Sequence, residues 1–375
     1  MRLRSLSVSM LITTLMTAGL LASAAYCATK PAISQSKQEA GARSQIFIAN
    51  RDEIVNKAKM EGKLRVITGL DRSVKITSKA FQKKYPFIAL HEETIRGTDS
   101  AQRNLLEIKS GAAKDWDIVR TYTDFYAEYF PHLWKVDLLG MAEQQILSIP
   151  PKMIDPKNRN VIALLSRFQV TAYNKTLVSN HHVPKSWDDI LAPEFRGRKF
   201  AADVRSQEIA SLVPVWGLEK TIDFARKIAA QQPIWVRGGS NIVQSVGSGE
   251  IPLFLGANYS SVKAFQRKDV LGNVQFVILE PVPVRLSSEQ AILATSKNPH
   301  AALLWLEWMA SSEAQMLIDE HEPLASSIYV QGSAVGQELK GKKLSVVSWD
   351  QNEKMELWIA KIFEAYGFPK TGDAK

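Results

Sequence analysis

The amino-acid sequence predicts an α/β protein with two lobes. Short segments rich in β-branched residues alternate along the chain with amphipathic segments of helical length. This alternation is typical of a parallel sheet that is covered by helices on both faces. In addition, the chain of 375 residues is longer than one hydrophobic core usually spans, even without its first 24 residues, which favours two cores.

The alternation begins after a polar N-terminal stretch. The expected elements are, in order, a strand at 63–69, a helix within 71–86, a strand at 87–94, a helix at 96–111 and a strand at 115–122. Lys83 and Lys84 lie in the last turn of the first of these helices and Pro86 follows it, which is a typical helix end. Gly111 is the expected stop of the second helix.

The same alternation returns in the second half of the chain. Strands are expected at 168–174, at a segment ending at Asp203, at 251–258, at 274–284 and at 287–295, and helices at 207–231, 241–248, 298–311 and 311–320. Trp305 and Trp308 could suggest an aromatic ligand site. They lie on a helix whose other positions are largely apolar, however, so we expect them to pack in the core.

The first 24 residues have the pattern of a secretory signal peptide. Arg2 and Arg4 precede an uncharged apolar run, and Ala22-Ser23-Ala24 supplies small residues with the spacing of a cleavage site. An uncleaved membrane anchor is the alternative, but the apolar run is short for a bilayer span. We therefore expect an exported protein that is cleaved after Ala24.

Composition narrows the possible partners. The formal net charge is +9, but the lysines and arginines are dispersed, so nucleic acid is a poor candidate partner for this exported chain. A basic cleft for anionic solutes remains open. Cys27 is the single cysteine, which excludes an internal disulfide and a thiol nucleophile in the body of the fold.

Four stretches of the sequence resemble a known family. They are GKLRVITGLDRSVKITSKAFQKKYP, VTAYNKTLVSNHHVPKSWDDILAPEFRGR, GSGEIPLFLGANYS, and EPVPV followed by ATSKNPHAALLWLEWMASSEAQ. In this order they resemble bacterial extracellular solute-binding proteins of ABC importers, in the branch that contains ferric-ion, polyamine, thiamine and organophosphate binders. The resemblance implies the type II periplasmic-binding-protein fold, in which two α/β lobes joined by two crossover hinge segments close on a solute. It also implies a periplasmic monomer whose partners are a small-molecule solute and an inner-membrane ABC permease.

The resemblance also implies a division of the chain. The crossovers are expected near 166–172 and 275–285. The expected regions are a signal peptide at 1–24, an N-terminal extension with the first helix at 25–61, a first lobe at 62–165 plus 286–345, a second lobe at 166–285, and a C-terminal helix and tail at 346–375.

Ligands of open α/β sheets bind at the carboxyl ends of the strands, beside the N-termini of helices. This rule nominates Arg72, Ser73, Gly97, Thr98, Ser100, Arg120, Tyr122 and Thr123 in the first lobe, and Asp203, Arg205, Gly239, Ser240, Asn258, Tyr259 and Ser260 in the second. Arginine forms paired hydrogen bonds with carboxylate or phosphate. An anionic organic solute is therefore the expected ligand, although caps and solvated surface groups would produce similar patterns.

Ferric ion and a polyamine are the two alternatives to an anionic organic solute. In the ferric binders of the family, the same strand end carries two adjacent tyrosines, because Fe³⁺ prefers anionic oxygen ligands. Here Ser260 follows Tyr259, so ferric binding through Tyr259 is kept as an alternative, and we expect its ring to lie along an organic solute. A polyamine is a further alternative, because several nominated loops also carry aspartates.

The sequence does not favour an enzyme. It contains no G-x-S-x-G, H-E-x-x-H or G-x-x-x-x-G-K-[ST] motif and no cysteine cluster for a metal. We therefore expect a binding protein that needs no cofactor and catalyses no reaction. A solute-sensing accessory of a two-component system is the alternative to an importer subunit.

Overall fold

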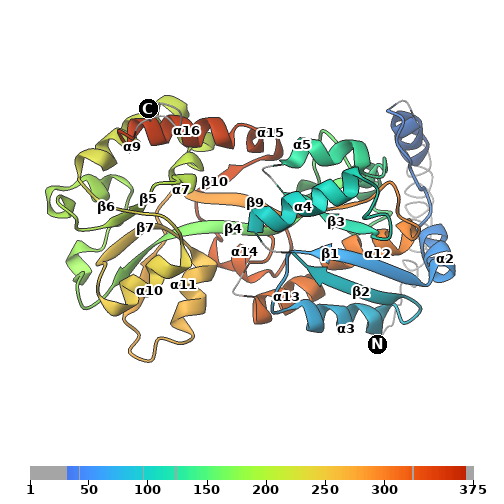
Figure 1. Cartoon of the computed structure of the whole chain (residues 1–375), viewed down its shortest axis with the longest axis horizontal. Coiled ribbons are helices and arrows are strands. Elements are labelled where there is room, and N and C mark those ends of the chain that lie inside the picture. The colour runs from blue at the N-terminus through green and yellow to red at the C-terminus, as the bar shows by residue number, and fades with distance from the viewer. Residues whose placement is uncertain (1–31, 42, 96, 123–124, 323–324, 369–375) are drawn as a thin grey trace, which may run out of the picture.

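The computed structural model describes residues 32–368, except 42, 96, 123–124 and 323–324. The predicted signal peptide at 1–24, the start of the extension and the end of the tail lie outside the described residues. Figure 1 shows an elongated molecule with two lobes, joined in the middle by two long strands. Among the described residues, no helix combines the length and the apolar character that a bilayer span requires.

One mixed sheet runs through both lobes in the order β2-β1-β3-β9-β4-β7-β5-β6, with β10 paired to β9 and β8 paired to β4. Pairing is parallel within β2-β1-β3 and within β7-β5-β6, and antiparallel between β3, β9, β4 and β7. The strands are β1 (Lys63–Thr68), β2 (Ala89–Thr94), β3 (Ile118–Arg120), β4 (Val161–Asn174), β5 (Ala201–Asp203), β6 (Ile234–Val236), β7 (Leu253–Asn258), β8 (Val274–Val277), β9 (Val282–Ile292) and β10 (Leu344–Val347).

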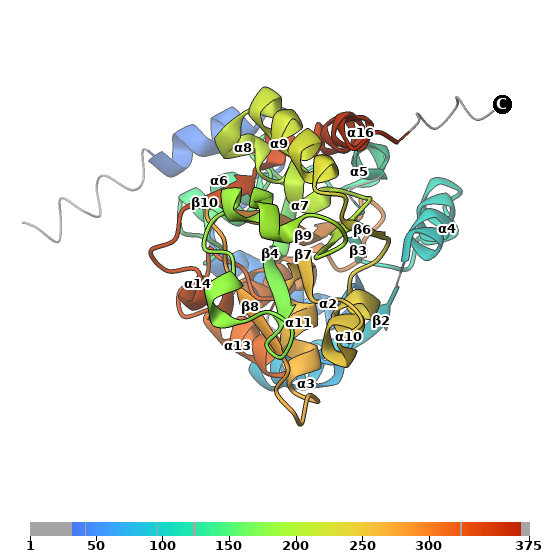
Figure 2. The same cartoon turned by 90° about the vertical axis from the view of Figure 1, so that its left-hand side faces the viewer.

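Helices cover both faces of this sheet, as the side view in Figure 2 shows. The α-helices are α2 (Arg51–Glu61), α3 (Val74–Lys84), α4 (Gly97–Lys109), α5 (Tyr126–Tyr129), α6 (Leu138–Glu143), α7 (Gln207–Ala210), α8 (Val213–Trp216), α9 (Leu218–Ala230), α10 (Ser240–Ser248), α11 (Tyr259–Gln266), α12 (Pro299–Met309), α13 (Ser312–His321), α14 (Ala334–Glu338), α15 (Trp349–Asn352) and α16 (Met355–Ala365). Residues 32–41 form a further helix. Short 3₁₀ helices at Phe130–His132, Pro151–Met153, Asn180–His182, Asp188–Leu191 and Pro193–Phe195 lie in the connections.

The linking strands β4 and β9 decide how the lobes are joined. They pair antiparallel from Val161 opposite Ala291 to Phe168 opposite Val284. The 14 residues of β4 reach about 46 Å at the usual rise of a strand, which is long enough to enter both lobes. The predicted crossover at 166–172 lies within β4. The predicted crossover at 275–285 begins too early, because residues 274–277 form the separate strand β8, which pairs with β4.

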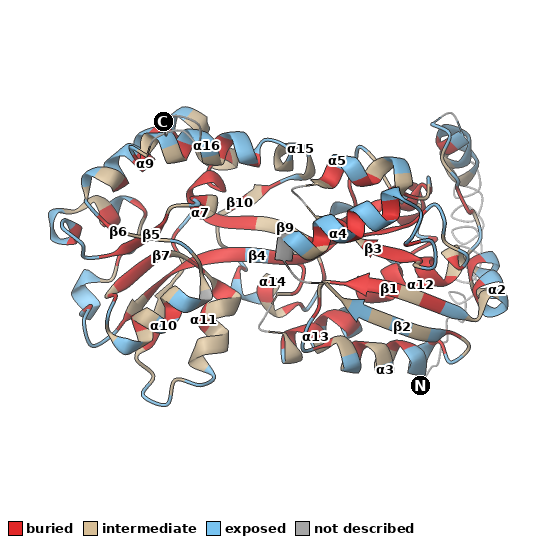
Figure 3. Cartoon of the chain, in the orientation of Figure 1, coloured by how far each residue is buried: buried red, intermediate tan, exposed pale blue. Residues whose placement is uncertain are grey.

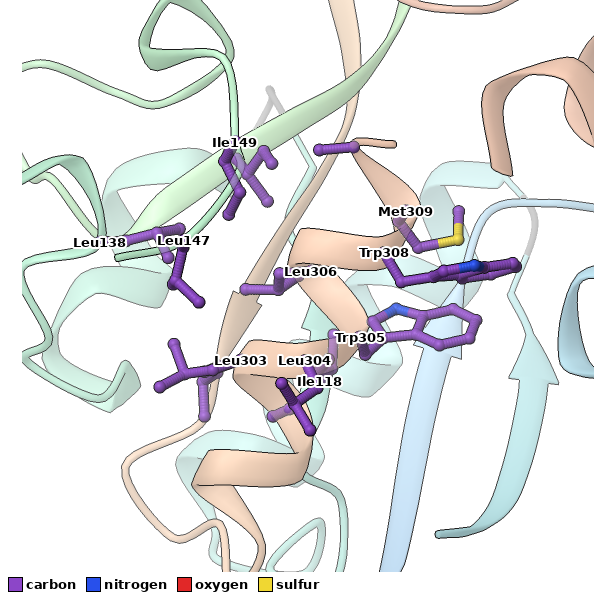
Figure 4. Packing of buried hydrophobic residues seen from close by; sticks show 14 of the residues in the cluster. Ile118, Leu138, Leu147, Ile149, Leu303, Leu304, Trp305, Leu306, Trp308 and Met309 are labelled. Carbon is purple, nitrogen blue, oxygen red and sulfur yellow. The ribbon is translucent and has the colours of Figure 1, made fainter. Parts of the chain in front are cut away.

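The first lobe has a large apolar core around α12. Trp305 and Trp308 are buried and pack edge-on against Phe81 of α3, with ring centroids 5.1 and 5.6 Å away. Figure 4 shows both indoles among Ile118, Leu304 and Met309, labelled as members of the same cluster. The expectation that these tryptophans are core residues is therefore confirmed.

The second lobe has its own apolar clusters, and the central strands of both lobes are largely buried in Figure 3, whereas the edge strand β2 is not. Val335 and Leu339 near α14, Val347 of β10 and Trp358 of α16 all belong to these second-lobe clusters. The chain therefore passes between the lobes once more, between α13 and α14. We propose that the first lobe ends near residue 333 and not at the expected 345, so that the C-terminal helix completes the second lobe.

Candidate ligand-binding site: the hinge pocket

A cavity of about 650 Å³ lies beside the middle of the linking strands, and it is called the hinge pocket here. The end of β3 and helix α5 line it from the first lobe, and α7, α15 and α16 line it from the second lobe. These elements meet around β4 and β9 near the centre of Figure 1. The volume is in the usual range for a small-molecule site, and such sites commonly lie between domains.

The pairing of β4 with β9 brings two arginines together at the floor of the hinge pocket. Arg167 lies directly opposite Arg285 in the antiparallel register, so the two side chains project from the same face of the sheet. Ser288 has φ of 58°, which interrupts the regular alternation, and residues 285–289 all line the pocket. Like charges opposite each other destabilise a sheet. The presence of two opposed arginines at this position therefore favours a function that uses their positive charge.

Arg120 adds a third guanidinium from the end of β3. Its Nη1 donates to the Tyr122 hydroxyl at 2.8 Å, and its guanidinium lies 4.2 Å from the centre of the Tyr122 ring. Gly69 makes room for it, because a Cβ at that position would lie 2.5 Å from Cζ of Arg120. Both Arg120 and Tyr122 line the hinge pocket; their role in ligand binding stays a prediction.

The charges of the floor act on one another. Burial and then the positive charge of Arg167 lower the pKa of Arg285 to about 10. Burial and then the charge of Arg120 lower the pKa of Arg167. Burial raises the pKa of Glu289, and the three arginines act in the opposite direction. The floor thus holds three guanidinium groups and one carboxylate, a local excess of positive charge that suits an anion.

Several buried polar atoms of this floor have no hydrogen-bond partner among the described residues. They are Nε of Arg120, Nε of Arg285, and the hydroxyls of Ser287 and Ser288. A buried donor or acceptor without a partner costs free energy. These atoms therefore favour a bound polar ligand that supplies the partners.

The loop before α3 presents an anion-binding arrangement that the chain itself fills. The backbone N–H groups of Asp71, Arg72 and Ser73 donate to one Oε1 atom of Glu322 at 2.5, 2.6 and 3.1 Å, and the Ser73 hydroxyl donates to the same oxygen at 3.1 Å. The rule that helix N-termini bind anions is therefore obeyed here, with Glu322 as the anion. Ser73 is committed to this contact, while the Arg72 side chain is exposed.

Four nominated residues lie at or just after the carboxyl ends of second-lobe strands, as expected. They are Asp203, Arg205, Gly239 and Asn258. Arg205 donates to Asp203, with Nη2 2.6 Å from Oδ2, and this hydrogen bond raises the pKa of Arg205. Its guanidinium is thus paired inside its own loop. Asn258 accepts from Nε2 of Gln169 at 3.5 Å and faces Gly239. None of the four lines the hinge pocket.

The structure corrects the expectation for Tyr259. The residue is 3% exposed and stacks on Phe168 at 4.4 Å. Its hydroxyl donates to Glu338 at 2.9 Å, and burial raises the pKa of Tyr259 above its ordinary value. The ring is therefore part of the second-lobe core, because the start of α11 turns it onto β4 and away from the pocket.

The remaining nominated residues carry less information. Ser100 lies on α4 and Ser260 on α11, both half-buried and both outside the hinge pocket. Gly97 and Thr98 begin α4 and Ser240 begins α10, but their side chains are outside the described residues. Thr123 lies outside the described residues altogether.

Sequence reasoning missed Arg167, Arg285 and Glu289. The strand-end rule directs attention to loops, and these residues lie in the middle of the linking strands. A signal was nevertheless present, because both arginines fall within the expected crossover ranges and interrupt apolar runs. Residues of α15 and α16 were also missed. Within the described part of the chain, no group of three or more His, Cys, Asp or Glu side chains could hold a metal ion.

Similarity to known proteins agrees with this architecture. The profile of the family described as bacterial extracellular solute-binding protein matches residues 77–323. The Fe(3+)-binding periplasmic protein of Serratia marcescens is 22% identical over 233 residues, which span 59% of this chain and 66% of that protein, just under two thirds of its length.

Solved structures support the same fold. FutA (IdiA) of Trichodesmium, in complex with iron and citrate, has a TM-score of 0.64 at 17% identity and covers 82% of this chain and 100% of its own. Ferric iron-binding protein A of Mannheimia haemolytica, in an open conformation, has a TM-score of 0.62 at 17% identity and covers 81% of this chain and 98% of its own. The predicted two-lobed α/β fold is confirmed. Because the family profile covers more than half of the sequence, this chain belongs to the bacterial extracellular solute-binding proteins.

Proposed function

We propose that this protein captures a small anionic organic solute, bearing a phosphate or a carboxylate, in the hinge pocket and delivers it to the membrane permease of an ABC importer. Membership of the solute-binding family supports the general role. The observation that carries the anionic ligand is the convergence of Arg120, Arg167 and Arg285 from three strands on one pocket. The protein acts as a periplasmic monomer, with its leader removed, and it catalyses no reaction.

The position of the arginines suggests how binding closes the lobes. Arg167 and Arg285 lie on the strands that join the lobes, whereas Arg120 belongs to the first lobe. A solute held by the linking strands that also contacts Arg120 and Gln207 of α7, which both line the pocket, joins the two lobes. Closure is then driven by contacts that exist only in the closed state.

Ferric ion is the second candidate, because the Serratia relative is named as an Fe(3+)-binding protein and the Mannheimia structure as a ferric iron-binding protein. In this chain Tyr259 has Ser260 as its neighbour and donates its hydroxyl to Glu338. Iron binding through Tyr259 would therefore require this residue to leave the core of the second lobe. The pocket floor fits an anion without any such rearrangement.

The function is tested by native mass spectrometry of freshly purified full-length protein, followed by calorimetric titration of the solute that is found. We expect an organic anion that dissociates under denaturing conditions. Arg285→Gln should weaken its binding about tenfold to hundredfold, because hydrogen bonds to charged groups contribute about 1.5–3 kcal/mol. Arg226→Gln on the exposed face of α9 removes the same charge from a residue that does not line the pocket and should leave the affinity unchanged. An iron adduct with affinity independent of Arg285 would refute the proposal.

A further inference from the structure

The hinge pocket has two electrically different walls. Its floor carries Arg120, Arg167 and Arg285 on β3, β4 and β9. Another part of the lining is formed by α5 and the segment from α15 to α16, called the acidic wall here, and it contributes three carboxylates, Glu128, Glu353 and Glu356. No lysine or arginine from this wall lines the pocket among the described residues.

The three carboxylates of this wall differ in their pairing. Glu128 is paired with Lys109, and Glu353 is paired with Lys157 at 3.2 Å. Glu356, on the first turn of α16, has no ion pair within the described residues. It is therefore the carboxylate of the wall whose charge no lysine of the described chain offsets.

The space between the two walls has an apolar lining. Phe125, Met355 and Ile359 line the pocket together with these charges. On the floor, Ser288 is 4% exposed, and its hydroxyl has no hydrogen-bond partner among the described residues. Glu289 is also 4% exposed, and the charges of the three arginines lower its pKa against the larger effect of burial.

We propose that the solute is a small zwitterion, with a phosphate or carboxylate at one end and an ammonium group at the other, joined by a short carbon chain. The anionic end binds the arginine floor, the carbon chain lies on the apolar lining, and the ammonium group pairs with Glu356. This inference rests on the proposed function and narrows its solute class. A solute with only an anionic end would leave Glu356 without a counter-charge, whereas Glu128 and Glu353 keep their lysine partners.

The inference is tested by calorimetric titration of the full-length protein at fixed ionic strength with two matched pairs of probes. One pair is phosphoethanolamine and ethyl phosphate, and the other is β-alanine and propionate. Glu356 is exposed, so in at least one pair the zwitterion should bind about twofold to fivefold more tightly than its anionic analogue, the range expected for one exposed ion pair. Glu356→Gln should reduce this ratio to about one while leaving the analogue unaffected. Glu219→Gln, an exposed charge on α9, should preserve the ratio.

The outcomes separate this inference from the proposed function. If the analogues bind at least as tightly as the zwitterions, and Arg285→Gln still weakens both, the zwitterion is refuted and the anion site stands. A preference that survives in Glu356→Gln also refutes the assignment. If neither pair shows binding that depends on Arg285, the anion site fails and the zwitterion fails with it.

Discussion

Glu208 is a buried carboxylate of α7 that lies near the arginine floor, and burial raises its pKa from the ordinary 4.5 to about 8. Below pH 4.5 the carboxyl is protonated in both the folded and the unfolded chain. Between pH 4.5 and 8 the folded chain keeps the proton and the unfolded chain loses it. The free energy of unfolding therefore falls as the pH rises through this window, and the effect levels off above pH 8.

Glu208→Gln removes this dependence, because the amide has a similar shape and no charge. Relative to the wild type, the variant should gain a few kcal/mol of stability between pH 5 and pH 8.5, since each pKa unit corresponds to about 1.4 kcal/mol. Urea unfolding of both proteins at pH 5, 6.5 and 8.5 measures the difference. A difference that stays constant with pH would show that Glu208 titrates normally.

Glu322 holds the N-terminus of α3 with one carboxylate oxygen that accepts from three N–H groups and one hydroxyl. Glu322→Gln keeps an acceptor but removes the negative charge that the helix N-terminus favours. We expect a loss of about 1–2 kcal/mol in the free energy of unfolding. Glu320→Gln, an exposed neighbour on α13, is the matched control and should change stability by less than about 0.5 kcal/mol. Equal effects in chemical denaturation would contradict the role of Glu322.

At the scale of elements, the sequence predicted the local structure well where one segment determines it. The helix within 71–86 and the strand at 63–69 agree with α3 and β1, because their apolar periodicity and end signals lie within the segments themselves. Such signals need no knowledge of the rest of the chain.

The linking strands were predicted less well. β4 begins at Val161, seven residues before the expected start, and the expected run at 274–284 divides into β8 and β9. Both strands are long because they belong to two lobes, and nothing local in the sequence records this. The candidate site was predicted incompletely for the same reason, because its geometry depends on contacts between segments that are distant in the sequence. The opposition of Arg167 to Arg285 arises from strand register, and the position of Tyr259 in the core depends on how α11 packs against β4.

The C-terminal helix α16 should be necessary for the stability of the second lobe. Trp358 is 6% exposed in the cluster with α7 and α9, whereas Leu357 beside it is 56% exposed. Trp358→Ala should lower the free energy of unfolding by about 3–5 kcal/mol, because it leaves a large cavity. Leu357→Ala should cost less than about 0.5 kcal/mol. Urea titrations that gave equal losses would mean that α16 does not pack on the second lobe as described.

At the scale of the whole molecule, the lobes are joined by two long strands and by the return of the chain between α13 and α14. A ligand on the linking strands alone would give no reason for the lobes to approach, because its contacts would be the same in the open and closed states. Arg120 makes the ligand contacts of the open and closed states differ, since it reaches the pocket from the first lobe through the end of β3. Closure should therefore depend on Arg120 more strongly than binding does.

Small-angle X-ray scattering tests this dependence with the anion identified by native mass spectrometry. The radius of gyration of the wild type should decrease when the ligand is saturating. Arg120→Gln should still bind through Arg167 and Arg285, with affinity reduced about tenfold, yet its radius of gyration at saturation should stay near the unliganded value. Arg226→Gln should behave as the wild type. Full compaction of the Arg120 variant at saturation would mean that other first-lobe groups drive closure, whereas an unchanged radius for the wild type would refute closure by this solute.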